Sequence, residues 1–538
     1  MTMRFLPASD RAVLVELDDL PQALALYRQL LQSPIAGVQE LVPAARTVLV
    51  GYQPGLLHAA AVEAAVRQRW ALAASSTAAP TQAPRTVEIP VDYSGPDLPD
   101  VAELLGISVA QVIERHTGQP WQAAFAGFAP GFVYLSGGHP CFDLPRRTTP
   151  RTQVPAGSVA LGGRFSAVYP NASPGGWQLL GTTALAMWDL SRPEPACVQP
   201  GMMVQFSALG NKKTIVIPAE ISIKNSKKKP ENINNNVEIA IEILDAGLQT
   251  LVQDQGRLGQ SGQGIAPSGA LDQGAMRQAN RLVGNPIHTP VLESVLGGLH
   301  LRSRGRTTLG VAGAQGPLHV LDAQGQPLQQ LSSPATVALN DGQSLRIAPP
   351  QAGVRAYVAV RGGWQLAPVL GSCATDTLAQ IGPPPVQAGA VLAVGSVPPQ
   401  HVQAVQTIDP AAVPALPRAG DAVVLDITWG PRSDWFHADA LALLTGQSWQ
   451  VTPRSNRIGM RLAGAQPLQR VRHDELPSEG TVNGAIQVPI SGQPVLFLAD
   501  HPLTGGYPVM AAVASHHLDL AAQIPVGCTI RFRVIAAA

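Results

Sequence analysis

The clearest deficit of this sequence is lysine, which is absent outside a single segment of 26 residues, 211–236. That segment holds Lys212, Lys213, Lys224, Lys227, Lys228 and Lys229. Both flanking parts must therefore do their chemistry without a side-chain amine. A phosphate loop of the Gly-x4-Gly-Lys-Ser/Thr type is excluded, because its lysine has to reach the outer phosphates. Any bound nucleotide must be held by arginines and backbone amides.

Other deficits narrow the class of protein. The four cysteines, Cys141, Cys197, Cys373 and Cys528, are scattered without a Cys-x-x-Cys pair. This spacing is typical of reduced thiols and of the cytoplasm. No run approaches the roughly 18 apolar residues of a membrane span, and the amino terminus lacks a signal-peptide core. We therefore expect a cytoplasmic protein without a membrane partner.

The sequence motifs of several catalytic and binding classes are also missing. The sequence contains no His-Glu-x-x-His, no cluster of His, Cys and carboxylate ligands and no Gly-x-Ser-x-Gly elbow, so we expect neither a metal site nor a serine hydrolase. Charged residues make up 14% of the chain, and outside the lysine segment 31 arginines face 34 acids. Such a balance implies no basic face for nucleic acid.

What is present is length, glycine and proline. The 538 residues suggest three to four domains of roughly 100–200 residues each, and Gly 52 with Pro 49 argue for many turns and against an all-helical protein. Residues 1–70 predict a small α/β domain with amphipathic helices over 20–32 and 56–70. An Ala, Ser, Thr and Pro-rich connector follows up to residue 85.

The rest of the chain predicts mainly strands. Residues 86–210 predict a second domain, in which Asp100 with Glu103 and Ser108 with Gln111 have the spacing of capping boxes for short helices that end near His116. Residues 211–236 are expected to be a disordered linker. Residues 237–538 predict two β-rich lobes with helices at 273–282 and 434–444.

Seven polar, glycine-rich strings are too long and too unusual in composition to be plain turns. The first half contains GFAPGFVYL (127–135), PRRTTPRTQVPAGSVALGG (145–163) and SPGGWQLLGTT (173–183). The second half contains TLVQDQGRLGQSGQGIAPSGALD (250–272), PRSNRIGMRL (453–462), SEGTVNGAIQVP (478–489) and LADHPLTGGYP (498–508).

By these strings the first half resembles the KipI-like family, also called allophanate hydrolase subunit 1 and associated with the B subunit of 5-oxoprolinase. The second half resembles the KipA-like, biotin-dependent carboxyltransferase family, also called allophanate hydrolase subunit 2 and associated with the C subunit. The resemblance covers nearly the whole chain except 211–236. It implies a mainly β fold with α+β portions, in which each half has a cyclophilin-like β-barrel and a small α/β domain precedes the first. It also implies that the two halves pair with each other.

Candidate binding residues in the first half are arginines, a histidine and a Gly-Gly-Trp string. Arg146, Arg147 and Arg151 form a positive cluster suited to carboxylate or phosphate, with a solvated loop as the alternative. Gly175 and Gly176 permit close backbone approach, while Trp177, followed by Gln178, offers a flat apolar face; a tight hairpin packed by the Trp is the alternative. His116 can titrate near neutrality, although a lone histidine is more often structural.

In the second half, Asp272 is placed to cap the helix that follows it. Alternatively, Ser268, Gly269 and Asp272 line a polar pocket at the helix amino terminus, which favours an anion. Arg454, Arg457 and Arg461 alternate with small and apolar residues, as on a strand edge that faces a cleft. Salt bridging across strands is the alternative.

The last strings add acids, amides and a phenol. Glu479 and Gln487 lie in a glycine-containing stretch, and Asp500 follows an apolar strand, which is a common position for catalytic residues and for turns. Gly505 and Gly506 can form an amide nest beside the phenol of Tyr507. We expect Asp272, Glu479, Asp500 and Tyr507 to be the catalytic candidates and the other residues to bind substrate or nucleotide.

One position departs from the family that the second half resembles. That family commonly reads Gly-Gly-Tyr-Pro-Lys, whereas here Pro508 is followed by Val509. A role of that amine cannot be carried over, which weakens carboxyl transfer.

Three functions compete. The resemblance favours the B and C portion of an ATP-dependent 5-oxoprolinase, with ATP and Mg²⁺, that opens 5-oxo-L-proline to glutamate together with a separate LamB/YcsF-like A subunit. The second is a biotin-dependent carboxyltransferase acting on a urea-type amide, which would need its biotin carrier in trans. The third is a non-enzymatic regulator of a histidine kinase.

Overall fold

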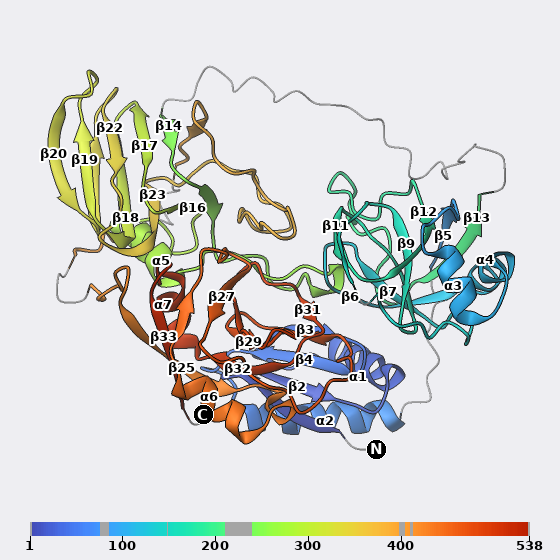
Figure 1. Cartoon of the computed structure of the whole chain (residues 1–538). Helices are drawn as coiled ribbons and strands as arrows, with labels where there is room; N and C mark the ends of the chain where they lie inside the picture. The colour runs from blue at the N-terminus through green and yellow to red at the C-terminus, as the bar shows by residue number, and fades with distance from the viewer. Residues whose placement is uncertain are drawn as a thin grey trace.

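The computed structural model describes residues 3–75, 85–147, 149–209, 239–396, 404–408 and 413–535. Strands dominate, and along the chain they form a small α/β unit, a nearly closed barrel, a pair of sheets and a closed barrel (Figure 1). The mainly β fold with a barrel in each half is therefore confirmed. The predicted linker at 211–236 lies outside the described residues.

The N-terminal unit is an antiparallel sheet in the order β1-β2-β4-β3. Its strands are β1 (Arg4–Ser9), β2 (Ala12–Glu16), β3 (Val38–Pro43) and β4 (Thr47–Tyr52), and its helices are α1 (Leu20–Gln32) and α2 (Ala59–Ser75). Successive side chains of a strand point to opposite faces. Val13 and Val15 accordingly pack with the helices, whereas Ala12 and Leu14 pack with Leu503 from the far end of the chain.

The first barrel, here called barrel 1, has the strand order β12-β9-β10-β7-β6-β13-β5. A bridge between Asp92 and Thr182 brings the end of β5 beside β12, so that the sheet nearly closes. The elements are β5 (Thr86–Val91), α3 (Leu98–Leu105), α4 (Val109–Thr117), β6 (Trp121–Ala126), β7 (Val133–Ser136), β8 (Arg151–Val154), β9 (Ser158–Gly162), β10 (Phe165–Val168), β11 (Ser173–Gly175), β12 (Gln178–Thr182) and β13 (Met203–Ala208).

The second half opens with two sheets that share an apolar core. One has the order β20-β19-β22-β17-β14-β24 and the other β15-β16-β23-β18-β21. The elements are β14 (Ala240–Ala246), β15 (Thr250–Gln253), η1 (Ser261–Gln263), α5 (Gln273–Leu282), β16 (Val291–Val295), β17 (Leu299–Arg304), β18 (Thr307–Gln315), β19 (Pro317–Leu321), β20 (Pro327–Ser332), β21 (Ala335–Leu339), β22 (Ser344–Ile347), β23 (Ala352–Val360) and β24 (Val391–Ala393).

The last body, barrel 2, closes in the order β25-β32-β29-β30-β27-β26-β33. The elements are β25 (Ala422–Trp429), η4 (Ser433–Trp435), α6 (Ala438–Gly446), β26 (Trp449–Val451), β27 (Gly459–Ala463), β28 (Glu479–Gly480), β29 (Ala485–Gln487), β30 (Val495–Phe497), β31 (Thr504–Gly505), β32 (Val509–Val513), η5 (Ser515–His517), α7 (Leu518–Ala522) and β33 (Thr529–Val534).

The two barrels follow the same path. In each, the first strand pairs in parallel with the last, β5 with β13 and β25 with β33, and the other strands neighbour one another in the same relative order. A register shift interrupts β12 between Leu179 and Gly181 opposite β9, and β32 has a matching irregularity opposite β29. The first and second halves thus carry two versions of one barrel.

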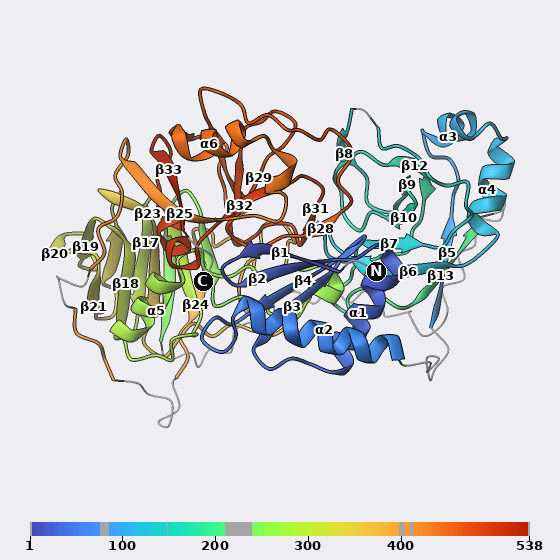
Figure 2. The same cartoon turned by 90° about the horizontal axis from the view of Figure 1, so that it is seen from below.

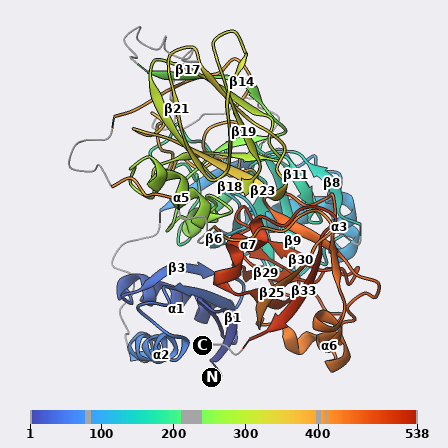
Figure 3. The ribbon, with the colours of Figure 1, turned by 90° about the vertical axis from the view of Figure 1, so that its left-hand side faces the viewer.

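The chain does not arrange its bodies in sequence order. The N-terminal unit packs against barrel 2, from the far end of the chain (Figures 1, 2 and 3), and its Leu24 and Ala44 also pack with the aromatic cluster of barrel 1. Glycine makes the contact with barrel 2 close, because a Cβ on Gly480 would lie 2.7 Å from the Cβ of Leu49. A Cβ on Gly127 of barrel 1 would likewise lie 2.2 Å from the Thr504 hydroxyl of barrel 2. Glycines of the polar strings therefore serve contacts between the halves.

The predicted helices agree with the structure to different degrees. The helices at 20–32 and 273–282 are confirmed at both ends, and the capping box of Ser108 with Gln111 is present. The capping box of Asp100 is wrong, because α3 already begins at Leu98, after Asp97, without a side-chain cap. The helix predicted over 56–70 begins at Ala59 and ends at Ser75. The one predicted over 434–444 is divided into η4 and α6.

Two further features of the structure concern the cysteines and the apolar length of the helices. All four cysteines are free. Among the helices of the described residues, none is long and apolar enough to cross a membrane.

Candidate functional site

A cavity of about 150 Å³ lies where barrel 1 meets barrel 2. Six of the predicted residues line it, namely Arg146, Gly175, Gly176, Trp177, Gly505 and Gly506. The other lining residues are Phe128, Phe132, Tyr134, Tyr169, Ser478 and Thr504. The Gly-Gly-Trp string of the first half and the Gly-Gly string of the second thus meet at one site, which we call the interbarrel cavity.

The interbarrel cavity combines one guanidinium with hydroxyl groups and aromatic faces. Arg146 Nε lies 2.7 Å from Glu475 Oε1, and both side chains remain partly exposed. Burial raises the pKa of Tyr169 to about 12, so that its hydroxyl stays protonated. The Thr504 hydroxyl is buried and has no hydrogen-bond partner among the described residues. Since none of the lining residues is acidic, the cavity suits a small anion with a flat apolar body.

Two equivalent two-stranded sheets contribute to the walls of the interbarrel cavity. In barrel 1, β8 pairs with β11 and sets Arg151 opposite Gly175. In barrel 2, β28 pairs with β31 and sets Glu479 opposite Gly505. A Cβ on Gly175 would lie 2.3 Å from the Tyr169 hydroxyl, so the glycine permits the close approach that was expected of it.

Each two-stranded sheet is anchored by ion pairs to one buried residue, and these two anchor residues have opposite charge. The Asp97 carboxylate accepts from Arg147 Nη1 at 2.7 Å and from Arg151 Nη1 at 2.9 Å and Nη2 at 2.7 Å. At the corresponding place in barrel 2, Arg432 Nε donates to Glu479 Oε2 at 2.9 Å and Nη2 donates to Glu16 Oε1 at 2.8 Å. The carboxylates of Glu479 and Glu16 raise the pKa of Arg432 despite its burial, so it stays charged.

The correspondence of Asp97 and Arg432 rests on the backbone. The Asp97 amide donates to the Leu179 carbonyl at 3.2 Å, and the Arg432 amide donates to the Val509 carbonyl at 3.0 Å. Leu179 and Val509 stand at the same register shift of their barrels. Arg147, Arg151 and Glu479, which we expected to bind ligand or to react, are therefore engaged as anchors of the cavity walls.

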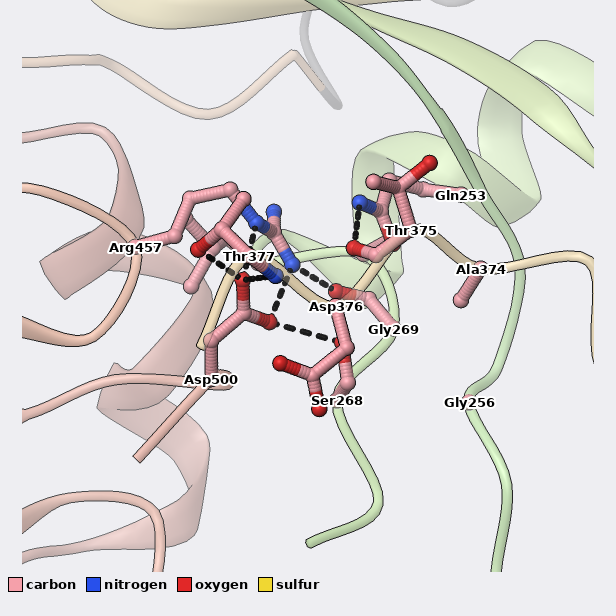
Figure 4. A network of polar contacts seen from close by, with 12 residues as sticks. Gln253, Gly256, Ser268, Gly269, Ala374, Thr375, Asp376, Thr377, Arg457 and Asp500 are labelled. Atoms are coloured by element: carbon pink, nitrogen blue, oxygen red, sulfur yellow. Dashed lines mark hydrogen bonds and ion pairs between the residues drawn. The ribbon is translucent and has the colours of Figure 1, made fainter. Parts of the chain in front are cut away.

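A second group of predicted residues forms a buried network between the sheets and barrel 2 (Figure 4). Asp500 accepts from Arg457 Nη2 at 2.9 Å and from Ser268 Oγ at 2.6 Å. Thr377 donates to the other oxygen through its amide at 2.9 Å and its hydroxyl at 2.7 Å. Burial alone would raise the pKa of Asp500, but the Arg457 charge holds it below its usual value. Both carboxylate oxygens of Asp500 accept hydrogen bonds, and the residue is fully buried. The network therefore connects the sheets to barrel 2.

Asp272 caps α5, as predicted. Its Oδ1 accepts from the Ala275 amide at 2.7 Å and its Oδ2 from Gln523 Nε2 at 2.8 Å. Burial, with the nearby Asp519, raises its pKa to about 7. The carboxyl group lies at the contact with barrel 2 and is not among the residues that line the interbarrel cavity.

The remaining predicted residues are dispersed. His116 is fully buried in barrel 1 between Tyr93 at 2.7 Å and Ser166 at 3.0 Å, and burial lowers its pKa to about 3. Gln178 is buried and donates to the Pro145 carbonyl. Arg454 and Arg461 are exposed while Arg457 is buried, so the expected edge with three arginines facing one cleft is wrong.

Two residues lie at the border of the interbarrel cavity. Gln487 is half-buried, and its Oε1 would lie 3.8 Å from a Cβ on Gly505. Tyr507 is 43% exposed, and the Arg470 guanidinium lies 5.7 Å from its ring centre. The Tyr507 phenol therefore stands outside the nest of Gly505 and Gly506 that it was expected to complete.

Sequence reasoning missed Asp97, Arg432 and the hydroxyl groups of the cavity. A signal for the anchors is present in the chain, because Gly95-Pro96-Asp97 and Gly430-Pro431-Arg432 each precede the first helical turn of a barrel. Both are followed much later by Gly-Gly and an aromatic residue. Aligning these strings would have indicated the duplication.

Val509 occupies the position where a lysine was expected from the resemblance. It is 7% exposed and belongs to a small apolar cluster with Ala485, Val495 and Phe497. The side chain at this position packs inside barrel 2.

Comparisons with known proteins agree with the duplicated architecture. Residues 263–534 match the family model of the carboxyltransferase domain, subdomain A and B, and residues 3–198 match that of subdomain C and D. The chain is 35% identical over 292 residues to the 5-oxoprolinase C subunit of Escherichia coli K12, covering 54% of this chain and 90% of that relative. It is 48% identical over 125 residues to the 5-oxoprolinase B subunit of Escherichia coli O157:H7, covering 23% of this chain and 57% of that relative.

A solved structure matches nearly the whole chain. The crystal structure of TTHA0988 has a TM-score of 0.79 at 32% identity and covers 97% of this chain and 99% of its own. This structural match spans both halves of the chain, and each half contains one barrel and matches one of the two family models. The chain belongs to the carboxyltransferase-domain family, and it joins a part related to the 5-oxoprolinase B subunit to a part related to the C subunit.

Proposed function

We propose that this chain supplies the B and C portions of an ATP-dependent 5-oxoprolinase, which opens 5-oxo-L-proline to L-glutamate together with a separate A subunit of the LamB/YcsF-like type. The observation that carries the proposal is the interbarrel cavity, which needs one wall from each half. The similarity of the two halves to the B and C subunits of 5-oxoprolinase supports it.

The chemistry of the cavity suits 5-oxoproline. This molecule is a flat five-membered lactam that bears one carboxylate. Arg146 can bind the carboxylate, since a guanidinium donates two parallel hydrogen bonds. The aromatic residues can pack on the ring, and the hydroxyl groups of Thr504 and Tyr169 can donate to the lactam oxygen. Fixed donors of this kind stabilise charge that develops on that oxygen.

ATP with Mg²⁺ does not fit the same residues. The cavity, at about 150 Å³, is smaller than the roughly 300–1,000 Å³ of pockets for drug-sized ligands. None of the residues that line it is a carboxylate that could hold the metal ion. A lactam resists water because its amide is resonance-stabilised, and phosphorylation of its oxygen would create a leaving group. We therefore assign the nucleotide to another part of the assembly and no nucleotide step to this cavity.

Carboxyl transfer with biotin is less well supported. The buried Val509 and the apolar cluster around it leave no amine at the position of the family's lysine. The residues that line the interbarrel cavity include no lysine either. These residues do not fit a site for carboxybiotin.

The test is reconstitution. The full chain is mixed with a purified A subunit, ATP and 5-oxoproline, and glutamate and ADP are measured. We expect both products to form, and Arg146→Ala to raise the KM for 5-oxoproline. Arg164→Ala is the matched control, because Arg164 belongs to barrel 1 but its side chain is 81% exposed. If the folded chain yields no glutamate with an A subunit that is active with another B and C pair, the proposal is wrong.

A further inference from the structure

A second and larger cavity, of about 270 Å³, lies between the N-terminal unit and the second half. Its lining residues are Tyr27, Leu30, Leu31, Pro34, Ile35, Val38, Gln39, Glu40 and Leu41 from α1, β3 and the segment between them, and Gly259, Ser261 and Gly262 from the second half. It shares no residue with the interbarrel cavity. We call it the Glu40 cavity.

The Glu40 cavity holds an acid without a cationic partner among the described residues. Both carboxylate oxygens of Glu40 are buried, and neither accepts a hydrogen bond from the residues that the structure describes. Burial raises the pKa of Glu40, and the Ser261 hydroxyl and the amides of Gly259 and Ser261 offset this only in part. The Ser261 hydroxyl also donates to the Leu41 carbonyl at 2.8 Å.

Three other buried acids of the chain differ from Glu40 in this respect. Asp97, Glu479 and Asp500 are each paired with at least one arginine. Burial of a carboxylate without a compensating donor costs several kcal/mol. For Glu40 no cation within the described residues offsets that cost, although the side chain stands beside a cavity large enough for a small molecule.

The walls of the Glu40 cavity define what would satisfy the acid. Leu30, Leu31, Ile35, Val38 and Leu41 provide hydrocarbon surface. The loop at 259–262 provides backbone amides beside the carboxylate, and Gly259 meets nothing within 4 Å of where its Cβ would be. An anion would be repelled by Glu40, whereas an ammonium group would supply both the missing charge and the missing donors.

We propose that the Glu40 cavity is a binding site for a small organic cation, in which an ammonium group pairs with Glu40 and a short hydrocarbon chain packs on the wall formed by α1 and β3. Because the walls come from both halves, the ligand would also strengthen the contact between the N-terminal unit and the loop at 259–262. Binding follows through a small shift of this loop, which opens the carboxylate to the cavity.

The experiment titrates the full chain with n-butylammonium chloride by isothermal calorimetry, with n-butyrate and n-butanol as probes of the same length. We expect butylammonium to bind, butanol to bind at least about tenfold more weakly, and butyrate not to bind, since hydrogen bonds to charged groups contribute roughly 1.5–3 kcal/mol. Glu40→Gln should weaken butylammonium about tenfold or more, while Glu40→Asp should retain part of the affinity.

A second variant keeps the test independent of how Glu40→Gln folds. Leu31 lines the Glu40 cavity and is 54% exposed, so Leu31→Arg places a cation from the chain itself within reach of the acid. It should abolish butylammonium binding and raise the melting temperature, whereas Leu72→Arg on the outer surface should do neither. Absence of butylammonium binding, equal affinity in Glu40→Gln, or preferential binding of butyrate would each overturn the proposal.

Discussion

Barrel 1 and barrel 2 place an anchor residue at the same backbone position, but the two anchors carry opposite charges. Both fix their two-stranded sheet with a charged residue that follows a Gly-Pro pair and donates its amide to the same strand position. In barrel 1 this residue is the acid Asp97, and in barrel 2 it is the base Arg432. The comparison teaches that the backbone fixes where an anchor stands, whereas either charge serves as long as the partner at the two-stranded sheet has the opposite charge.

The surroundings of the two anchors differ as well. Arg147 and Arg151, the partners of Asp97, have side chains that are 33% and 25% exposed. Arg432 is 2% exposed and lies between Glu479 and Glu16, of which Glu16 belongs to the N-terminal unit. The barrel 2 anchor therefore also holds two bodies of the molecule together, while the barrel 1 anchor acts within its own barrel.

The largest effect is expected from Arg432→Met. The substitution leaves Glu479 buried without its cation and removes one partner of Glu16, so it should destabilise barrel 2 by about 3–5 kcal/mol. Hydrogen exchange of the β28 and β31 amides, followed by mass spectrometry, measures this local opening. Arg531→Met is the control, because Arg531 is an exposed residue of β33 in the same barrel. Equal exchange in both variants would show that the anchor is dispensable.

Asp97→Asn should have a smaller effect. The amide oxygen of Asn can still accept from the Leu179 amide, as Asp97 Oδ2 does at 2.7 Å, and the two arginines can regain water. We expect a loss of about 1–3 kcal/mol, seen as faster exchange in β8 and β11 but not in β28 and β31. Asp143→Asn, at an exposed ion pair with Arg164, should change the exchange of neither strand pair. An effect as large as that of Arg432→Met would contradict the difference in burial on which the comparison rests.

The third prediction concerns a buried tryptophan that each barrel contains at the start of a strand. Trp121 begins β6 and donates to the His116 carbonyl at 3.0 Å, and Trp449 begins β26 and donates to the Leu444 carbonyl at 2.8 Å. Both indoles are fully buried. Trp121→Phe and Trp449→Phe each leave a buried carbonyl without its donor, so each should destabilise its barrel by about 1–3 kcal/mol. Urea unfolding of each variant measures the losses, and losses that differ by more than about 2 kcal/mol would refute the equivalence.

Much of the fold could be predicted from the chain. The helix at 20–32 has an apolar face and the helix at 273–282 has Asp272 before it, and both features are local. The resemblance supplied the barrels. The docking of the N-terminal unit on barrel 2 could not be predicted, because Ala12, Leu14 and Leu503 lie some 490 residues apart and alternation in a strand says only that both faces are covered.

The candidate site could be predicted in part for a similar reason. The glycine strings were found because glycine marks close approach, and they do line the interbarrel cavity. The role of charged residues could not be inferred, because an arginine in a string looks the same whether it lines a cavity, as Arg146 does, or pairs with a buried acid 50 residues earlier, as Arg147 does. That distinction depends on tertiary contacts.

The smallest effect is expected at Glu475, which stands four residues before Glu479 as Arg147 stands four before Arg151. Arg147 turns back to its own anchor, whereas Glu475 reaches across to Arg146 of barrel 1. A partly exposed pair of this kind contributes only about 0–1 kcal/mol, so a carboxylate ligand can displace Glu475 easily. Glu475→Gln should thus raise the affinity for 5-oxoproline about two- to fivefold, measured by isothermal calorimetry, while Glu194→Gln at the exposed pair with Arg85 leaves it unchanged. An affinity that falls in Glu475→Gln would mean that Glu475 holds Arg146 in place for the ligand, and the two halves would then contribute to the cavity as partners rather than as competitors for one guanidinium.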